Sequence, residues 1–271
     1  MNEIKHGDAT IRYVITGNGA ITLLFVHGSY IDQSYWKDQV AFFNRDYTVV
    51  TFDLPGHGVS GRERQHWSMQ GFAEDVVALI KKLDLKNVIL IGHSIGADIN
   101  LMAANQYAGP IIGFIAIDIF KNAAMPLSED YQQQAAGIKA KLETDFAPTN
   151  EAYARMALLT PATPAIIAER VVQAYRNAWA PMAIATTPEI FTMFQVEREL
   201  LPKLAFKLYL INVDYTPADE NALREYAGSG YQLFHMDGTC HYPMLEHPET
   251  LNTLLKEAIE NIGTLTGISS K

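Results

Sequence analysis

The stretch VILIGHSIGAD, residues 88–98, decides the fold because it joins a buried strand to a helix through one serine. Its apolar run ends at Gly92, and a helical pattern resumes after Gly96. A serine on so sharp a turn takes a strained backbone conformation that projects its hydroxyl outward, and the residues two positions away must be small. The first amides of the helix lie near where an oxyanion would form. We therefore predict Ser94 as a nucleophile and the amide of Ile95 as an oxyanion donor, the alternative being a structural turn serine.

Short runs rich in branched apolar residues recur along the chain and predict strands. Runs such as ITLLFV and NVILI are almost wholly apolar, which is typical of strands buried on both faces of a parallel sheet. Helical patterns lie between them, so we predict a three-layer α/β fold with a mostly parallel sheet and helices on both faces. The predicted strands are Thr10–Thr16, Ile21–Val26, Tyr47–Phe52, Asn87–Ile91, Ile111–Ile117, Phe206–Val213 and Tyr231–Met236.

The alternation of strands and helices stops between about Phe120 and Leu200. This region has a helical pattern broken by prolines, and it is rich in aromatic residues and methionine. We predict that residues 121–200 form a helical cap inserted into a core made of residues 1–120 and 201–271. An insertion over a sheet edge creates a concave apolar site, so a few of these side chains are expected to face a ligand and the others to pack.

Two further turns carry polar residues where strands end, which is where functional groups gather in a parallel sheet. In His27-Gly28-Ser29, glycine allows close approach of the backbone, and we predict the amide of Ser29 as the second oxyanion donor. We expect His27 to orient this loop rather than to transfer protons. His241 follows the last predicted strand. A serine hydroxyl needs a base to remove its proton, and histidine does so near neutral pH, so we predict His241 as the base.

The histidine needs a carboxylate that holds its tautomer and stabilises its charged form. Asp214 and Asp219 both follow the strand-like run that ends at Val213. Asp219 has a structural explanation, because Thr216-Pro217-Ala218-Asp219 is typical of a capping box with proline at the first helical position. We therefore prefer Asp214 and keep Asp219 and Asp118 as alternative acids. Asp118 ends the run GFIAID.

The composition of the chain limits the classes of binding partner and the cellular compartment that we expect. The 271 residues suit one domain or a domain with an insertion. A net charge of -9 argues against nucleic acid or an anionic membrane as the main partner. One cysteine, Cys240, excludes an intrachain disulfide and a cysteine-based zinc cluster. The N-terminus lacks the apolar core of a signal peptide, and no apolar run is long enough to span a membrane. We expect a cytoplasmic protein, and the sequence leaves its oligomeric state open.

Four motifs together resemble the α/β-hydrolase fold superfamily. They are HGS (27–29), DLPGHGVS (53–60), GHSIG (92–96) and GTCHYPMLEHPE (238–249). The resemblance implies an α/β-hydrolase core with a helical cap, Ser94 as nucleophile, His241 as base, and an acid after a late strand. It also implies oxyanion donors at Ser29 and Ile95. Relatives commonly have glycine where this chain has Cys240, which we expect to be structural. The turn INVDYTP is shorter than usual, which leaves the identity of the acid open.

A serine nucleophile favours acyl transfer over the aspartate chemistry of dehalogenation and epoxide opening. The expected function is hydrolysis of a small, fairly apolar carboxylic ester through an acyl-enzyme, with no metal or organic cofactor. The apolar, methionine-rich cap motivates this substrate class. Alternatives on the same residues are hydrolysis of a carbon–carbon bond in a diketone or of a lactone. The non-enzyme alternative is a ligand receptor that retains the triad, because one scaffold hosts many functions.

Overall fold

The fold is built on one eight-stranded sheet, described over residues 1–268 of the computed structural model. The strands are β1 (Asn2–His6), β2 (Ala9–Thr16), β3 (Thr22–Val26), β4 (Thr48–Asp53), β5 (Val88–His93), β6 (Ile111–Ile117), β7 (Leu208–Val213) and β8 (Tyr231–Met236). Their order is β1-β2-β4-β3-β5-β6-β7-β8. Only the pairs β1–β2 and β2–β4 are antiparallel. The predicted α/β class with a mostly parallel sheet is thus confirmed.

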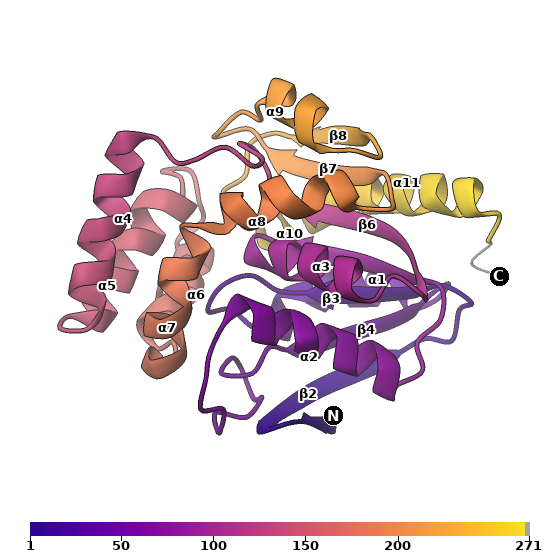
Figure 1. Cartoon of the computed structure of the whole chain (residues 1–271), viewed down its shortest axis with the longest axis horizontal. Helices are drawn as coiled ribbons and strands as arrows, with labels where there is room; N and C mark the ends of the chain where they lie inside the picture. The colour runs from indigo at the N-terminus through magenta and orange to yellow at the C-terminus, as the bar shows by residue number, and fades with distance from the viewer. Residues whose placement is uncertain (269–271) are drawn as a thin grey trace.

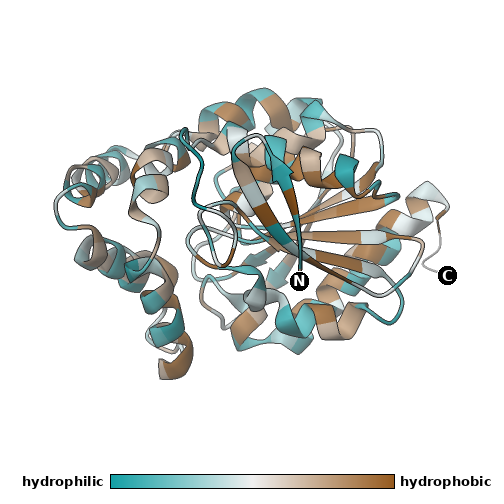
Figure 2. Cartoon of the chain, turned by 90° about the horizontal axis from the view of Figure 1, so that it is seen from below, coloured by the Kyte–Doolittle hydropathy of each residue, from teal (hydrophilic) through white to brown (hydrophobic). Residues whose placement is uncertain are grey.

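Helices cover both faces of the sheet (Figure 1). They are α1 (Lys37–Phe43), α2 (Met69–Lys82), α3 (Ile95–Gln106), α9 (Glu220–Tyr226), α10 (Pro243–Glu246), α11 (Pro248–Thr266) and the short 3-10 helices η1 (Gln33–Trp36) and η3 (Leu201–Lys203). In β3, Leu24 joins the apolar cluster that includes α2 and α3, whereas Leu23 and Phe25 join the cluster that includes α1 and α11. Neighbouring side chains of a strand point to opposite faces of the sheet. A strand that is covered by helices on both faces therefore needs apolar residues at successive positions. Figure 2 shows the resulting band of hydrophobic strands between the helices.

A second group of helices lies between β6 and β7 in the sequence. It consists of α4 (Glu129–Leu142), α5 (Phe146–Tyr153), a π-helical turn η2 (Ala154–Leu158), α6 (Ala165–Arg176), α7 (Ala180–Ile190) and α8 (Met193–Leu200). Figures 1 and 2 both show α4 to α7 beside one end of the sheet, whereas α8 returns to the core and packs against α3. We call residues 121–200 the helical insertion; their division from the core as a separate cap stays a prediction.

The sequence patterns predicted seven of the eight strands and missed β1. This strand is a mostly exposed edge strand, joined to β2 by the two-residue turn Gly7-Asp8. Gly7 has φ +57°, which suits a tight hairpin turn. Ser68 caps α2, since its hydroxyl accepts a hydrogen bond from the amide of Gly71 at 3.0 Å. Within residues 1–268, no helix has both the length and the apolar character needed to cross a membrane.

Candidate active site

The turn between β5 and α3 holds Ser94 in the conformation that the sequence predicts. Its φ of 52° and ψ of -131° lie outside the regions favoured by side-chain-bearing residues. Such a conformation is tolerated only where the surroundings over-determine it. The amide of Ser94 donates to the carbonyl of Ile117 at 3.0 Å, which ties the turn to the end of β6. Ser94 is only partly buried, so its hydroxyl remains accessible.

The two flanking glycines are required by close backbone packing. A Cβ atom on Gly92 would lie 2.5 Å from the Cα atom of Ala97, and one on Gly96 would lie 2.4 Å from the carbonyl oxygen of Val26. Both contacts are with backbone atoms, which cannot move aside as a flexible side chain could. The G-x-S-x-G pattern is therefore a packing requirement here, as well as a motif.

The His27-Gly28-Ser29 loop lies against the serine turn. A Cβ atom on Gly28 would approach Nδ1 of His93 to 2.7 Å and Cβ of Ser94 to 3.2 Å. His27 itself is fully buried, and its Nδ1 donates to the carbonyl of Gly28 while its Nε2 accepts from the amide of Leu54. Burial lowers the pKa of His27, which favours the neutral ring that these two bonds require. The structure confirms that His27 orients this loop.

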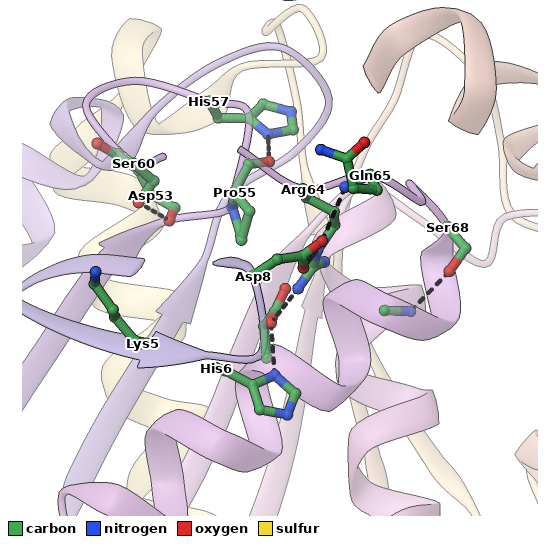
Figure 3. A network of polar contacts seen from close by, with 12 residues as sticks. Lys5, His6, Asp8, Asp53, Pro55, His57, Ser60, Arg64, Gln65 and Ser68 are labelled. Atoms are coloured by element: carbon green, nitrogen blue, oxygen red, sulfur yellow. Dashed lines mark hydrogen bonds and ion pairs between the residues drawn. The ribbon is translucent and has the colours of Figure 1, made fainter. Parts of the chain in front are cut away.

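The loop after β4 also supports the region around the His27-Gly28-Ser29 loop. The Asp53 carboxylate accepts from the amides of Gln33 at 2.8 Å and Val59 at 2.9 Å, so one side chain joins two loops. Figure 3 shows this loop continuing into a polar network in which Arg64 lies between the N-terminal hairpin and α2. Arg64 binds the buried Asp75 at 2.7 Å. The DLPGHGVS motif thus acts as a support for the site.

Asp118 is the carboxylate that the structure places against His241. Oδ2 of Asp118 lies 2.5 Å from Nδ1 of His241, and both side chains are buried. Asp118 follows β6 directly with φ +50°. A carboxylate at Nδ1 fixes the proton there and leaves Nε2 free to accept a proton.

The preference for Asp214 as the partner of the histidine is therefore wrong. Asp214 is exposed, and its carboxylate accepts a hydrogen bond from the amide of Gly238 at 3.1 Å. The alternative Asp219 has a structural role, but not the predicted one: it is itself the N-cap of α9 and accepts from the amides of Asn221 and Ala222, so the helix begins after Asp219 and not at Pro217. The third candidate, Asp118, occupies the position because β6 lies between β5 and β7.

Other groups surround the Asp118 carboxylate. Nζ of Lys121 lies 2.7 Å from Oδ1, which also accepts from the amide of Val213 at 3.2 Å. The hydroxyl of Tyr215 donates to Oδ2 at 3.4 Å. Burial alone would raise the pKa of Asp118, but the hydrogen bonds and charges of His241 and Lys121 outweigh burial and lower it. Asp118 is therefore an anion at neutral pH.

His93, the residue before the serine, joins the serine turn to the histidine loop. Its Nε2 donates to the carbonyl of His241 at 2.7 Å, and the centroids of the two rings are 4.6 Å apart. Burial lowers the pKa of His93 to about 3, so its ring is neutral and adds no charge beside His241. The amide of His241 donates to the carbonyl of Leu158, which connects this loop to the helical insertion as well.

A cavity of about 660 Å³ lies between the end of the sheet and the helical insertion. Ser29, Ser94, Ile95, Asp118 and His241 all contribute to its wall. The insertion contributes a largely apolar wall, whose aromatic and methionine members are Met125, Tyr131, Tyr153, Met156, Tyr175, Phe191, Met193 and Phe194. The sequence predicted that a few aromatic and methionine side chains of the insertion would face a ligand and that the others would pack; these eight line the cavity, whereas Met182, for example, is buried in the core.

Comparison with known proteins fits this geometry. Residues 23–254 match the model of the Alpha/beta hydrolase family. The chain belongs to this family. A thermophilic esterase from Thermogutta terrifontis shares the fold of this alpha/beta hydrolase with a TM-score of 0.82 and 20% sequence identity, covering 97% of this chain and 99% of the esterase. At this identity the likeness concerns the fold alone, and it confirms the predicted three-layer hydrolase architecture.

Curated relatives of this alpha/beta hydrolase include both a receptor and an enzyme. "Karrikin insensitive 2 receptor CA" of Petunia hybrida is 34% identical over 94 residues, which are 33% of this chain and 35% of the receptor. "2-(acetamidomethylene)succinate hydrolase" of Mesorhizobium japonicum is 29% identical over 112 residues, 41% of this chain and 40% of that enzyme. The matches thus span between a third and two-fifths of these relatives' lengths.

The cavity of the hydrolase also contains a buried pair of acids that sequence analysis missed. Asp98 lies in the first turn of α3 and Glu197 on α8, and their carboxyl groups hydrogen-bond each other. Glu197 also accepts from the amide of Ala124 at 2.7 Å. Burial, and then the charge of Glu197, raise the pKa of Asp98 well above its ordinary value; burial also raises the pKa of Glu197. The raised pKa values favour retention of a proton on this pair, which lies between α3 and α8.

Cys240 is fully buried beside the histidine, and its amide donates to the carboxylate of Glu246 at 2.5 Å. Burial raises the pKa of its thiol to about 12, so it carries no thiolate at neutral pH. The structural role expected for this residue stays a prediction. Lys121 and Tyr215 were also missed. Lys121 is three residues after Asp118, which was only an alternative acid in the sequence, and Tyr215 follows a different strand, β7.

We predict that Asp98→Asn stabilises the hydrolase at high pH more than at low pH. The folded wild type retains a carboxyl proton that the unfolded chain releases above about pH 4, so its stability falls as pH rises from there toward the raised pKa of Asp98. Asparagine still donates to Glu197 and has no proton to lose. The thermal midpoint of the variant should exceed that of wild type at pH 8, and the difference should shrink toward pH 4.

The exposed Asp214→Asn variant is the matched control, since it makes the same replacement at a carboxyl group that is not buried. Its thermal midpoint should differ from that of wild type by a similar amount at both pH values. A midpoint difference for Asp98→Asn that does not depend on pH would contradict retention of a proton by this pair.

Proposed function

We propose that this hydrolase cleaves small, fairly apolar carboxylic esters through an acyl-enzyme on Ser94, with His241 as base and Asp118 as the acid. The observation that carries the proposal is the 2.5 Å contact between Asp118 and His241 at the wall of the cavity that also contains Ser94. Titratable groups held in such mutual geometry identify acyl-transfer sites on unrelated folds.

In the first half of the reaction, Nε2 of His241 takes the proton of the Ser94 hydroxyl while Oγ attacks the ester carbonyl carbon. Asp118 stabilises the imidazolium that forms. The tetrahedral intermediate then collapses, the bond to the alkoxy oxygen breaks, and the imidazolium gives its proton to the leaving alcohol. In the second half, water loses a proton to His241 and attacks the acyl carbon, and Ser94 recovers its proton as the carboxylic acid departs.

The backbone amides of Ser29 and Ile95 supply the donors for the negatively charged oxygen. Among residues 1–268, neither amide donates a hydrogen bond to another protein group. Both residues line the cavity together with Ser94. Removal of one such donor typically costs about 10²–10³ in kcat, so two preorganised amides are a substantial part of the proposed rate enhancement.

The apolar wall of the insertion supports a substrate with an apolar acyl or alcohol group. Tyr30, next to the proposed oxyanion donor, hydrogen-bonds Thr187 of α7 and packs edge-on against Tyr175 of α6. The insertion therefore contacts the loop that would hold the reacting carbonyl. A cavity of about 660 Å³ lies within the usual range for small-molecule sites.

A triad-retaining receptor is the second candidate, because one relative with 34% identity over a third of the chain is named as a receptor. A receptor would bind a ligand with little or no turnover. The two candidates share the same residues and differ in turnover number, so one assay separates them.

We predict that wild type hydrolyses p-nitrophenyl esters and that Ser94→Ala lowers kcat/KM by about three orders of magnitude or more. The release of p-nitrophenol from esters of increasing acyl chain length measures kcat/KM. The preferred length shows how large an acyl group the cavity accepts. Circular dichroism establishes that the variant is folded. If Ser94→Ala retained most of the activity, the serine mechanism would be contradicted. If folded wild type showed no turnover, the receptor candidate would be favoured.

Two aspartate variants then test the assignment of the acid. Asp118→Asn should lower kcat by about 10³–10⁴, because asparagine stabilises the wrong tautomer of His241 and offers no negative charge to the imidazolium. Asp214→Asn, an exposed change of the same chemistry, should stay within about twofold of wild type. A larger loss of activity in Asp214→Asn than in Asp118→Asn, measured in steady-state ester assays, would assign the acid of the triad to Asp214.

A further inference from the structure

Lys121 places an ammonium group on the carboxylate that holds the histidine. Nζ of Lys121 is 2.7 Å from Oδ1 of Asp118, and the ammonium lies 4.2 Å from the centroid of the Tyr215 ring. The side chain of Lys121 is only 13% exposed. A buried lysine is costly unless it is paired, so this position is a specific feature of the site and not a surface ion pair.

The two oxygens of Asp118 serve two different cationic or potentially cationic partners. Oδ2 faces Nδ1 of His241, and Oδ1 faces Lys121. Lys121 is anchored through its own backbone, since its carbonyl accepts the amide of Asp219 at 2.6 Å. The amide of Val213 completes the shell of Oδ1 at 3.2 Å. The carboxylate is thus held in one orientation from both sides.

We propose that Lys121 is a positioning residue that aligns Asp118 and offsets part of its charge, so that the Asp118–His241 pair works as a base at lower pH than it would without the lysine. This inference rests on the proposed function. A cation near an imidazole disfavours the protonated ring, whereas an unshared carboxylate favours it. Lys121 weakens the stabilisation of the protonated ring by Asp118 without abolishing it.

Among residues 1–268, the other ionisable groups beside His241 do not duplicate this role. Tyr242, whose ring centroid lies 5.3 Å from that of His241, is a neutral phenol because burial raises its pKa. His93 packs against the His241 ring but is held neutral by burial, with its pKa lowered to about 3. The neighbouring Cys240 is a neutral thiol, and burial raises the pKa of Tyr215, which is therefore a neutral phenol at physiological pH. Glu246, which accepts a hydrogen bond from the amide of Cys240, is an acidic residue and does not supply a positive charge.

The test compares pH profiles of kcat/KM for wild type, Lys121→Met and Lys121→Arg between pH 5 and pH 9. Loss of the cation should move the acid limb of Lys121→Met upward by about one pH unit. Activity should then be about tenfold lower than wild type on that limb and within about twofold at pH 8.5. Lys121→Arg keeps the charge and should follow wild type. Lys203→Met removes the same charge from an exposed ion pair on the surface and should leave the profile unchanged.

A purely structural lysine would give a different result. Lys121→Met would then lower kcat/KM by the same factor at every pH, and the acid limb would not move, which would overturn the inference. If Lys121→Met fails to fold, Lys121→Gln removes the charge and keeps a hydrogen-bond donor for Oδ1, and the same shift is expected for it.

A spectroscopic measurement separates failure of this inference from failure of the proposed function. The pH titration of the His241 ring in 15N-labelled protein reports its protonation without any substrate. A midpoint that rises in Lys121→Met supports the inference even if no ester is hydrolysed. Ester hydrolysis combined with an unmoved titration midpoint and an unmoved acid limb would overturn the inference and leave the proposed function standing.

Discussion

The contact between Asp118 and His241 is the interaction on which the rest of the site depends. It spans 123 positions of sequence and joins the end of β6 to the loop before α10. The parallel sheet makes it possible, because β5, β6 and β7 are neighbours and end at the same edge. With Nδ1 engaged, the histidine has one nitrogen left, and only that nitrogen can serve a substrate or a nucleophile.

The residues around the Asp118–His241 pair hold the backbone of the neighbouring loops in place. The glycines around Ser94 allow strand, helix and loop to approach closely, and Asp53 joins two loops that support His27. Neutral histidines at positions 27 and 93 fill the space between these loops through hydrogen bonds and add no charge. Rigid support of this kind is what electrostatic catalysis requires, because donors must be in place before charge develops.

Local chemistry explains which features could be predicted from the sequence. The turn at Ser94, the loop at His27 and a structural role for Asp219 near a helix start each follow from residues within one short segment, and the apolar runs identified seven strands. The acid was assigned to the wrong strand, because its choice depends on which neighbouring strand end reaches the histidine. The pairing of Asp98 with Glu197 likewise arises only when α8 packs on α3.

Covalent labelling by a phosphorylating p-nitrophenyl ester measures the central claim most directly. Attack by an activated serine should release p-nitrophenol in a burst of about one equivalent per chain and leave a stable phosphoryl group, which mass spectrometry of peptides locates. The account predicts a single adduct on Ser94, lost in Ser94→Ala and strongly slowed in Asp118→Asn. A label on another residue, or no label on folded protein under conditions where free p-nitrophenol is detectable, would contradict it.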